Sequence, residues 1–218
     1  MKINKFNESI DVSNLYLKSV EVITDVNPLK AGVKLEIKKP ICFIVGDNGV
    51  GKSTLLECVR NYYGDVPKNY MYRPKMKENI KLIDSGNKFN FKYIDFHGDD
   101  MKFASAFIDD SMGLQIQQMK ASSGQVSISL LNNALGDLEK VKDGLIILDE
   151  PCRGQSIKNK WRVVRLITGL TERFNCQVIL TTHSDTILSA FKGVAQYYDI
   201  SLNADTTYRD FMISQLKD

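Results

Sequence analysis

The stretch that decides the fold is Gly46-Asp47-Asn48-Gly49-Val50-Gly51-Lys52-Ser53-Thr54. It follows the apolar run Ile-Cys-Phe-Ile-Val at residues 41–45 and leads into Leu-Leu-Glu-Cys-Val at residues 55–59. The order strand, tight loop and helix is therefore predicted. Glycines let the backbone curl so that successive N–H groups face inward, beside the positive end of the helix dipole. A chance glycine-rich turn is the alternative, but Lys and Ser at the start of the helix favour a phosphate-binding loop.

The side chains of this loop have separate expected roles. Lys52 should reach the β- and γ-phosphates of a nucleotide as a point charge, and the Ser53 hydroxyl should ligate Mg²⁺. All nine residues from 46 to 54 are expected to contact the nucleotide, through backbone N–H groups or side chains. The expected cofactors are ATP and Mg²⁺.

Composition is ordinary for a globular protein and narrows the class. The chain has 218 residues, 43% apolar and 25% charged, with a formal net charge of +3. That charge alone is too weak to predict nucleic-acid binding. Four scattered cysteines show no metal-ligand spacing and are interpreted as reduced thiols. No uncharged apolar run is long enough for a bilayer and residues 1–6 do not resemble a secretory signal, so a cytoplasmic location is expected.

The apolar patterns predict alternating strands and helices. The first strands are predicted at residues 15–23 and 33–37, as an antiparallel layer, and the next at 80–83 and 88–96. Helices are expected at residues 52–62, 101–119, 125–138 and 156–174. Continuous apolar runs at 144–148 and 176–180 predict buried parallel strands. The pattern favours an α/β sheet with functional residues at the carboxyl ends of its strands.

A carboxylate pair follows one of these buried strands. Asp149 and Glu150 come directly after Leu-Ile-Ile-Leu at residues 145–148, which is a Walker B pattern. Asp149 is expected to hold Mg²⁺ opposite the Ser53 hydroxyl. Glu150 is expected to orient and deprotonate the attacking water.

Between the loop and this pair lies Ala121-Ser122-Ser123-Gly124-Gln125. Here the chain resembles the ATP-binding-cassette (ABC) ATPase superfamily, whose signature is Leu-Ser-Gly-Gly-Gln. Ser122, Gly124 and Gln125 match that signature, and Ala121 and Ser123 depart from it. The resemblance implies that the matching residues bind nucleotide held by a second copy, which makes an ATP-dependent homodimer. Taken alone, these residues also fit a serine-rich helix cap.

The resemblance also implies the architecture. We expect one ABC-type ATPase domain over residues 1–218, with a central, mainly parallel sheet, flanking helices and an N-terminal antiparallel layer. A reduced helical lobe is expected at about residues 68–125. His183, in Thr181-Thr182-His183-Ser184, matches the family's switch histidine and is expected to contact the γ-phosphate. Ser156 stands where transport ATPases carry the D-loop aspartate, which puts coupling through that carboxylate in doubt.

Two family features have no clear counterpart. In the interval of the Q-loop glutamine stands the run 93–100, where Asp95 or His97 could contact Mg²⁺ or water, or could belong to a polar turn. Tyr16 is a candidate for stacking on adenine, against the alternative of a surface or core tyrosine.

Three functions remain open at the level of sequence. The divergent D-loop, the Thr-His-Ser ending and the short interval between residues 53 and 122 favour a stand-alone ATPase, similar to those of DNA repair and phage defence. Such a protein would clamp or remodel nucleic acid or a partner protein, and the basic, tyrosine-containing stretch 68–81 could bind phosphates or be a solvated loop. The alternatives are a separate ATP-binding subunit of a membrane transporter and a slow, nucleotide-gated regulatory module.

Overall fold

The computed structural model describes residues 15–64, 76–96, 141–152 and 155–216. A six-stranded sheet lies at its centre, in the spatial order β5-β6-β7-β3-β8-β9. The strands are β3 (Ile41–Val45), β5 (Asn90–Asp95), β6 (Gly144–Asp149), β7 (Gln177–Thr181), β8 (Gln196–Asp199) and β9 (Ala204–Thr206). The first five in spatial order pair in parallel, and β9 pairs with β8 in the antiparallel sense. The expected central, mainly parallel sheet is confirmed.

The predicted antiparallel layer is also present. It consists of β2 (Lys34–Glu36), β1 (Leu17–Val22) and β4 (Ile80–Asp84), in that spatial order. A short 3-10 helix, η2 (Met76–Asn79), leads into β4. The strand predicted at residues 80–83 therefore extends this layer, whereas β5 joins the central sheet.

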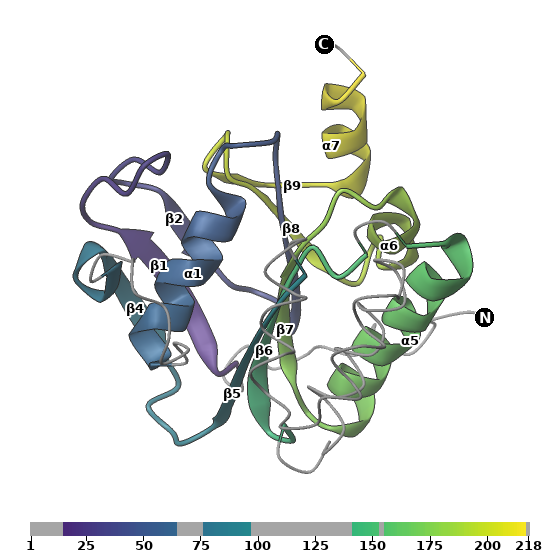
Figure 1. Cartoon of the computed structure of the whole chain (residues 1–218), viewed down its shortest axis with the longest axis horizontal. Helices are drawn as coiled ribbons and strands as arrows, with labels where there is room; N and C mark the ends of the chain where they lie inside the picture. Colours follow the sequence, from purple (N-terminus) through teal and green to yellow (C-terminus); the bar gives the residue numbers. More distant parts are fainter. Residues whose placement is uncertain (1–14, 65–75, 97–140, 153–154, 217–218) are drawn as a thin grey trace, which may run out of the picture.

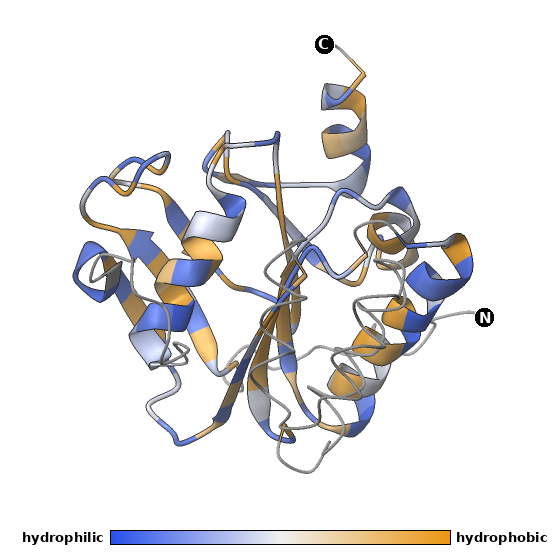
Figure 2. Ribbon diagram, viewed as in Figure 1, coloured by the Kyte–Doolittle hydropathy of each residue, from blue (hydrophilic) through white to orange (hydrophobic). Residues whose placement is uncertain are grey.

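Both faces of the central sheet are covered, which explains its continuous apolar strands. All residues of β3, β6 and β7 are buried, and alternate side chains along each strand face opposite sides. On one side, α1 (Lys52–Tyr63) lies between the central sheet and the antiparallel layer, and its Leu55, Leu56 and Val59 share one apolar cluster with both. Figure 2 shows the hydrophobic colour concentrated along the sheet and the inward sides of the helices.

The other side of the sheet carries α5 (Ile157–Arg173) and α6 (Asp185–Ala190). Val163, Val164 and Ile167 of α5 pack on the sheet residues Ile146 and Val178 in a second apolar cluster. The side chain of Ser156 accepts a hydrogen bond from the Asn159 N–H, so Ser156 is the N-cap of α5. Last in the chain, α7 (Tyr208–Ser214) adds Phe211 to the same cluster.

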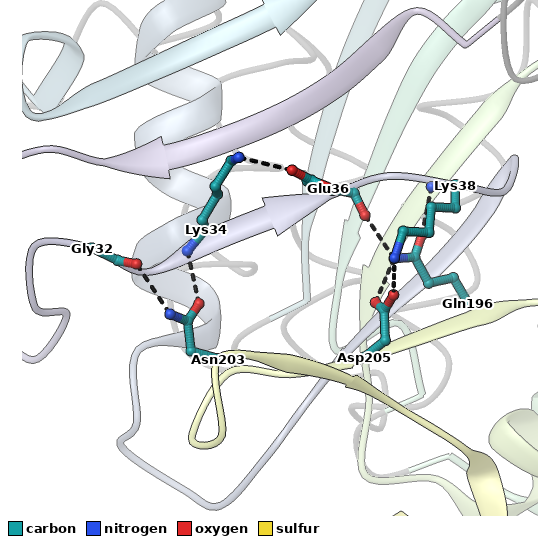
Figure 3. Close-up of polar contacts among 7 residues, drawn as sticks. All are labelled: Gly32, Lys34, Glu36, Lys38, Gln196, Asn203 and Asp205. Carbon is teal, nitrogen blue, oxygen red and sulfur yellow. Dashed lines mark hydrogen bonds and ion pairs between the residues drawn. The ribbon is translucent and has the colours of Figure 1, made fainter.

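The β8–β9 hairpin is bound to β2 and to the segments on both sides of it (Figure 3). Asn203 accepts a hydrogen bond from the Lys34 N–H (2.8 Å) and donates one to the Gly32 carbonyl (3.0 Å). Asp205 pairs with Lys38 at 2.5 Å and accepts a hydrogen bond from Gln196 at 2.7 Å. The two sheets are therefore joined at this edge by polar contacts as well as by the apolar cluster around α1.

The bounds of the predicted elements that the structure describes agree with the sequence patterns to within a few residues, but not every element was predicted. No pattern in the sequence predicts α6, β8, β9 or α7. The helices expected at residues 101–119 and 125–138, and most of the lobe expected at 68–125, lie outside the described residues. Within the described part, none of the helices combines the length and the apolar character needed to cross a bilayer.

Candidate functional site

The loop between β3 and α1 has the backbone shape that its glycines predict. Gly46 and Gly51 have φ angles of 133° and 104°, which side-chain-bearing residues rarely adopt. A Cβ atom on Gly51 would lie 2.5 Å from Leu29 Cδ2, so the close approach of that side chain also requires glycine. Gly51 is the N-cap of α1 and has no side chain to cap it, which leaves N–H groups of the first turn available to an anion.

Lys52 is folded back over this loop. Its Nζ donates hydrogen bonds to the carbonyls of Gly46 (2.8 Å) and Asp47 (2.7 Å), and the residue is only 7% exposed. Burial lowers the pKa of Lys52, whereas the nearby carboxylates of Glu150 and Asp149 raise it. Since both hydrogen-bond acceptors are neutral carbonyls, the ammonium keeps its positive charge for a phosphate.

Asp149 ends β6 beside Ser53. The Ser53 hydroxyl donates to Asp149 Oδ1 at 3.1 Å, Thr181 donates to the same oxygen, and Tyr93 donates to Oδ2 at 3.3 Å. Asp149 is almost completely buried. One hydroxyl and one carboxylate fit Mg²⁺, which takes oxygen ligands and is bound in such sites by one or two protein groups together with phosphates and water. Among the described residues no group of three or more His, Cys, Asp or Glu side chains could hold a metal by itself.

Glu150 has a strained backbone at the end of the same strand. Its φ angle is 52°, which is uncommon for a residue with a side chain and is often found at functional sites. Its N–H donates to Thr181 Oγ1 at 3.1 Å, and its Oε1 lies 3.5 Å from His183 Nε2. Within the described part of the chain, Glu150 Oε1 is buried without a hydrogen-bond donor. A water molecule or ligand hydroxyl would supply that donor.

Lys52, Ser53 and Glu150 border one pocket of about 710 Å³, whereas Asp149 contacts Ser53 but does not itself line the pocket. One wall is the loop and the start of α1, with Asn48, Gly49, Gly51, Lys52, Ser53 and Thr54. The other wall contains Glu150, Cys152, Lys160, Thr182, His183 and Ser184. The expected loop, Walker B glutamate and switch histidine thus come together around one cavity. The hydroxyl of Ser184 in this wall is buried and has no partner among the described residues, so it is available to a ligand.

Three of the nine expected loop residues do not line the cavity. Gly46 and Asp47 hold Lys52 through their carbonyls, and Asp47 also accepts a hydrogen bond from Gln215, just after α7, at 3.1 Å. The Val50 side chain packs toward the apolar cluster around α1. The signature residues Ser122, Gly124 and Gln125 lie outside the described residues.

The remaining candidates are placed as follows. Tyr16 hydrogen-bonds with Asn175, which precedes β7, so it lies at the edge of the sheet opposite the loop and is not positioned to stack on adenine there. Asp95 ends β5, whereas His97 lies outside the described residues. Of the basic stretch, the described part includes Lys77, whose Nζ lies 5.1 Å from the centre of the Tyr62 ring. Its residues 68–75 are not described.

Sequence patterns did not point to three residues of the candidate site: Tyr93 and Thr181, which contact Asp149, and Lys160, which lines the pocket. Tyr93 and Thr181 bind Asp149 from the strands on either side of β6. Burial, with the negative charges of Asp149 and Asp95, raises the pKa of Tyr93, so its hydroxyl keeps its proton and donates. The only signal in the sequence was the position of Thr181 two residues before His183 and of Tyr93 two residues before Asp95.

No protein-family model matches the chain. It is similar to the zinc import ATP-binding protein ZnuC of Haemophilus influenzae, with 26% identity over 199 residues that cover 84% of this chain and 71% of ZnuC. ZnuC of Histophilus somni is 28% identical over 179 residues, 77% of this chain and 66% of that protein. ZnuC of Anaplasma phagocytophilum is 27% identical over 157 residues, 66% of this chain and 62% of that protein.

Solved structures agree on the fold. A nucleotide-free ATP-binding cassette from an ABC transporter superposes with a TM-score of 0.57 and 16% identity, over 94% of this chain and 96% of that one. Clostridium perfringens cbiO1, part of the ABC transporter complex cbiONQ, gives a TM-score of 0.54 at 17% identity, with 92% of each chain covered.

The comparisons do not support the expected subgroup, a stand-alone ATPase. The sequence favoured a stand-alone type similar to repair and defence ATPases, whereas the relatives found are named as zinc import ATP-binding proteins. The narrower expectation is therefore not supported, while the broader one is. This chain has the P-loop fold of ABC-type ATPases, and its sequence is similar to zinc import ATP-binding proteins named ZnuC.

Proposed function

We propose that this protein is an ABC-type ATPase that binds Mg-ATP in the 710 Å³ pocket and hydrolyses it to ADP and phosphate. The observation that carries the proposal is that Lys52, Ser53 and Glu150 line that one cavity, with Asp149 hydrogen-bonded to Ser53 directly behind it. These groups supply a cation for the phosphates, oxygen ligands for a metal and a base for water, which are the parts that phosphoryl transfer to water needs.

Each group has a defined part in binding. The N–H groups of the loop and of the first turn of α1 would hold the β- and γ-phosphate oxygens, and the Lys52 ammonium would exchange its carbonyl contacts for them. Ser53 and Asp149 would hold Mg²⁺, which neutralises charge that develops on the phosphate oxygens.

Hydrolysis would proceed by in-line attack of water on the γ-phosphorus. Glu150 accepts a proton from the water, whose oxygen forms the new bond to the γ-phosphorus while the bond to the bridging oxygen breaks and ADP departs. Glu150 Oε1 is buried and without a donor among the described residues, and so is prepared to accept this hydrogen bond. His183, 3.5 Å from Glu150, would donate to the γ-phosphate.

We further propose that two copies share each nucleotide. This part rests on the resemblance of Ser122, Gly124 and Gln125 to the ABC signature. In a sandwich of that kind the second copy closes the open side of the pocket, so hydrolysis depends on dimerisation.

For the biological role, the relatives favour an ATP-binding subunit that works with a membrane transporter. The three relatives described above are named as zinc import ATP-binding proteins, and they match 66 to 84% of this chain. A second candidate is a clamp on nucleic acid or a partner protein. It is favoured by Ser156, which replaces the D-loop aspartate of transport ATPases and caps α5 instead.

Nucleotide binding and turnover by the purified protein test the chemistry. We expect Lys52→Ala to lose tight nucleotide binding, because the buried cation is removed, and Glu150→Gln to keep binding while turnover falls at least about 100-fold. Lys88→Ala, which changes an exposed lysine before β5, should match the wild type in both assays. Wild-type turnover in Glu150→Gln would contradict the mechanism.

Co-purification tests the role. The Glu150→Gln protein, loaded with Mg-ATP in a native-cell lysate, should retain an integral membrane protein if it is a transporter subunit. Salt-sensitive binding of DNA by the purified protein, with no membrane protein retained, would favour the clamp instead.

A further inference from the structure

Both oxygens of Asp149 are held by hydroxyl groups from three different elements. Oδ1 accepts from Ser53 of α1 and from Thr181 of β7, and Oδ2 accepts from Tyr93 of β5. Thr181 and Tyr93 are 0% and 5% exposed. We infer that Tyr93 and Thr181 are positioning residues that fix the Asp149 carboxylate for Mg²⁺. This inference rests on the proposed function and deepens it.

Strand register brings Thr181 to the Asp149 carboxylate and to the backbone of Glu150. Asp149 of β6 pairs directly with Thr181 of β7, so the two side chains lie side by side at the carboxyl ends of parallel strands. A threonine hydroxyl has one proton to donate and lone pairs to accept. It donates to Asp149 and at the same time accepts from the Glu150 N–H at 3.1 Å. One side chain thus links the metal-binding carboxylate to the strained backbone of the expected base.

Tyr93 is held so that its hydroxyl points at Asp149. Its strand β5 flanks β6 on the other side, with Tyr93 paired to Ile147, two residues before Asp149. The Arg60 guanidinium carbon of α1 lies 4.6 Å from the centre of the Tyr93 ring, a cation–π distance. The ring is therefore enclosed between β5 and α1, and its hydroxyl reaches Asp149 Oδ2 at 3.3 Å.

This arrangement does more than satisfy buried polar groups. Mg²⁺ demands near-ideal octahedral geometry, so a carboxylate ligand must not rotate. Ser53 alone restrains one oxygen, and it would bind the metal itself; Tyr93 and Thr181 restrain both oxygens from outside the metal's own coordination shell. Groups that orient metal ligands in this way typically contribute about 10- to 100-fold to metal affinity.

The test is nucleotide affinity as a function of Mg²⁺, measured by titrating a fluorescent ATP analogue. Tyr93→Phe and Thr181→Val each remove one hydroxyl and keep the side-chain shape. We expect both to bind nucleotide like the wild type in EDTA, and to need about 10-fold more Mg²⁺ for half-maximal enhancement of binding. Matched controls are Tyr63→Phe, whose hydroxyl contacts Asp84, and Thr168→Val, whose hydroxyl contacts the Val164 carbonyl within α5. Both controls should keep the wild-type requirement for Mg²⁺.

The outcomes separate this inference from the proposed function. If the wild-type protein shows no Mg²⁺-dependent nucleotide binding, the proposed function fails. If the wild type does, but Tyr93→Phe and Thr181→Val behave like their controls, the positioning role is overturned. Thr181→Ser keeps the hydroxyl and should restore the wild-type Mg²⁺ requirement to within about twofold. A requirement in Thr181→Ser as high as in Thr181→Val, with both folded by thermal melting, would show that packing and not the hydroxyl matters.

Discussion

Lys160 belongs to α5 but lines the same pocket as Glu150 and His183. Burial raises the pKa of Cys152 in the same wall to about 12, and the positive charge of Lys160 partly offsets that rise. Lys160 is therefore close to this wall of the pocket. Lys160 is one of several basic residues within residues 157–173, a pattern that is typical of a solvated helix face. Its position in the pocket that Glu150 also lines instead favours a role as a second lysine for the triphosphate.

We predict that Lys160→Met lowers the affinity for Mg-ATP by about 3- to 10-fold, and lowers the affinity for ADP less, since one charge-assisted contact to phosphate is lost. Titration calorimetry with both nucleotides measures this. Lys158→Met changes an exposed lysine of the same helix and is the matched control. Equal affinities in the two variants would exclude a role for Lys160 in binding.

At the scale of residues, roles that depend on a local pattern can be predicted from the sequence, and contacts that depend on strand pairing cannot. Lys52 and Ser53 follow from one contiguous stretch, and Asp149 from the end of one apolar run. Tyr93 and Thr181 could not be assigned to Asp149, because their contacts depend on β5 and β7 flanking β6. The order of strands in the sheet is a property of the whole fold, and the separate sequences of β5, β6 and β7 do not reveal it.

Elements with strong apolar patterns were predictable and short ones were not. β6 and β7 are continuous buried runs, and α5 has 17 residues with an apolar face, so each could be recognised. β9 has three residues and α6 has six, too few for a period to show. β4 was recognised as a strand, but nothing local predicted that it pairs with β1 and not with the central sheet.

The cap of α5 permits a stability prediction. Ser156 Oγ accepts from the Asn159 N–H at 3.4 Å, a long hydrogen bond, so Ser156→Ala should lower the free energy of unfolding by about 0.5–1 kcal/mol. Urea unfolding measures the change as a lower midpoint with an unchanged slope. Ser189→Ala, within α6, removes a hydroxyl that donates at 3.4 Å to the Thr186 carbonyl of its own helix but caps no helix end, so a change below about 0.5 kcal/mol is expected. A midpoint for Ser156→Ala no lower than that of Ser189→Ala would mean that the cap adds no stability.

The whole molecule presents the pocket between the loop on one side and Glu150, Lys160 and His183 on the other. For a sandwich of two copies, we predict that Glu150→Gln in saturating Mg-ATP is a dimer by light scattering, because turnover no longer releases the closed state. The same variant without nucleotide should be a monomer. A monomer under both conditions would contradict the shared site and leave single-copy binding intact.

Helix α1 is packed on both sides, because its Leu55, Leu56 and Val59 belong to one apolar cluster with residues of the central sheet and of the antiparallel layer. A helix packed on both sides has little freedom to tilt or slide. The loop at residues 46–51, which leads into α1, is therefore preorganised, and binding of an anion does not have to order it. Affinity should then depend chiefly on how well a ligand's charge and shape suit a cradle that already exists.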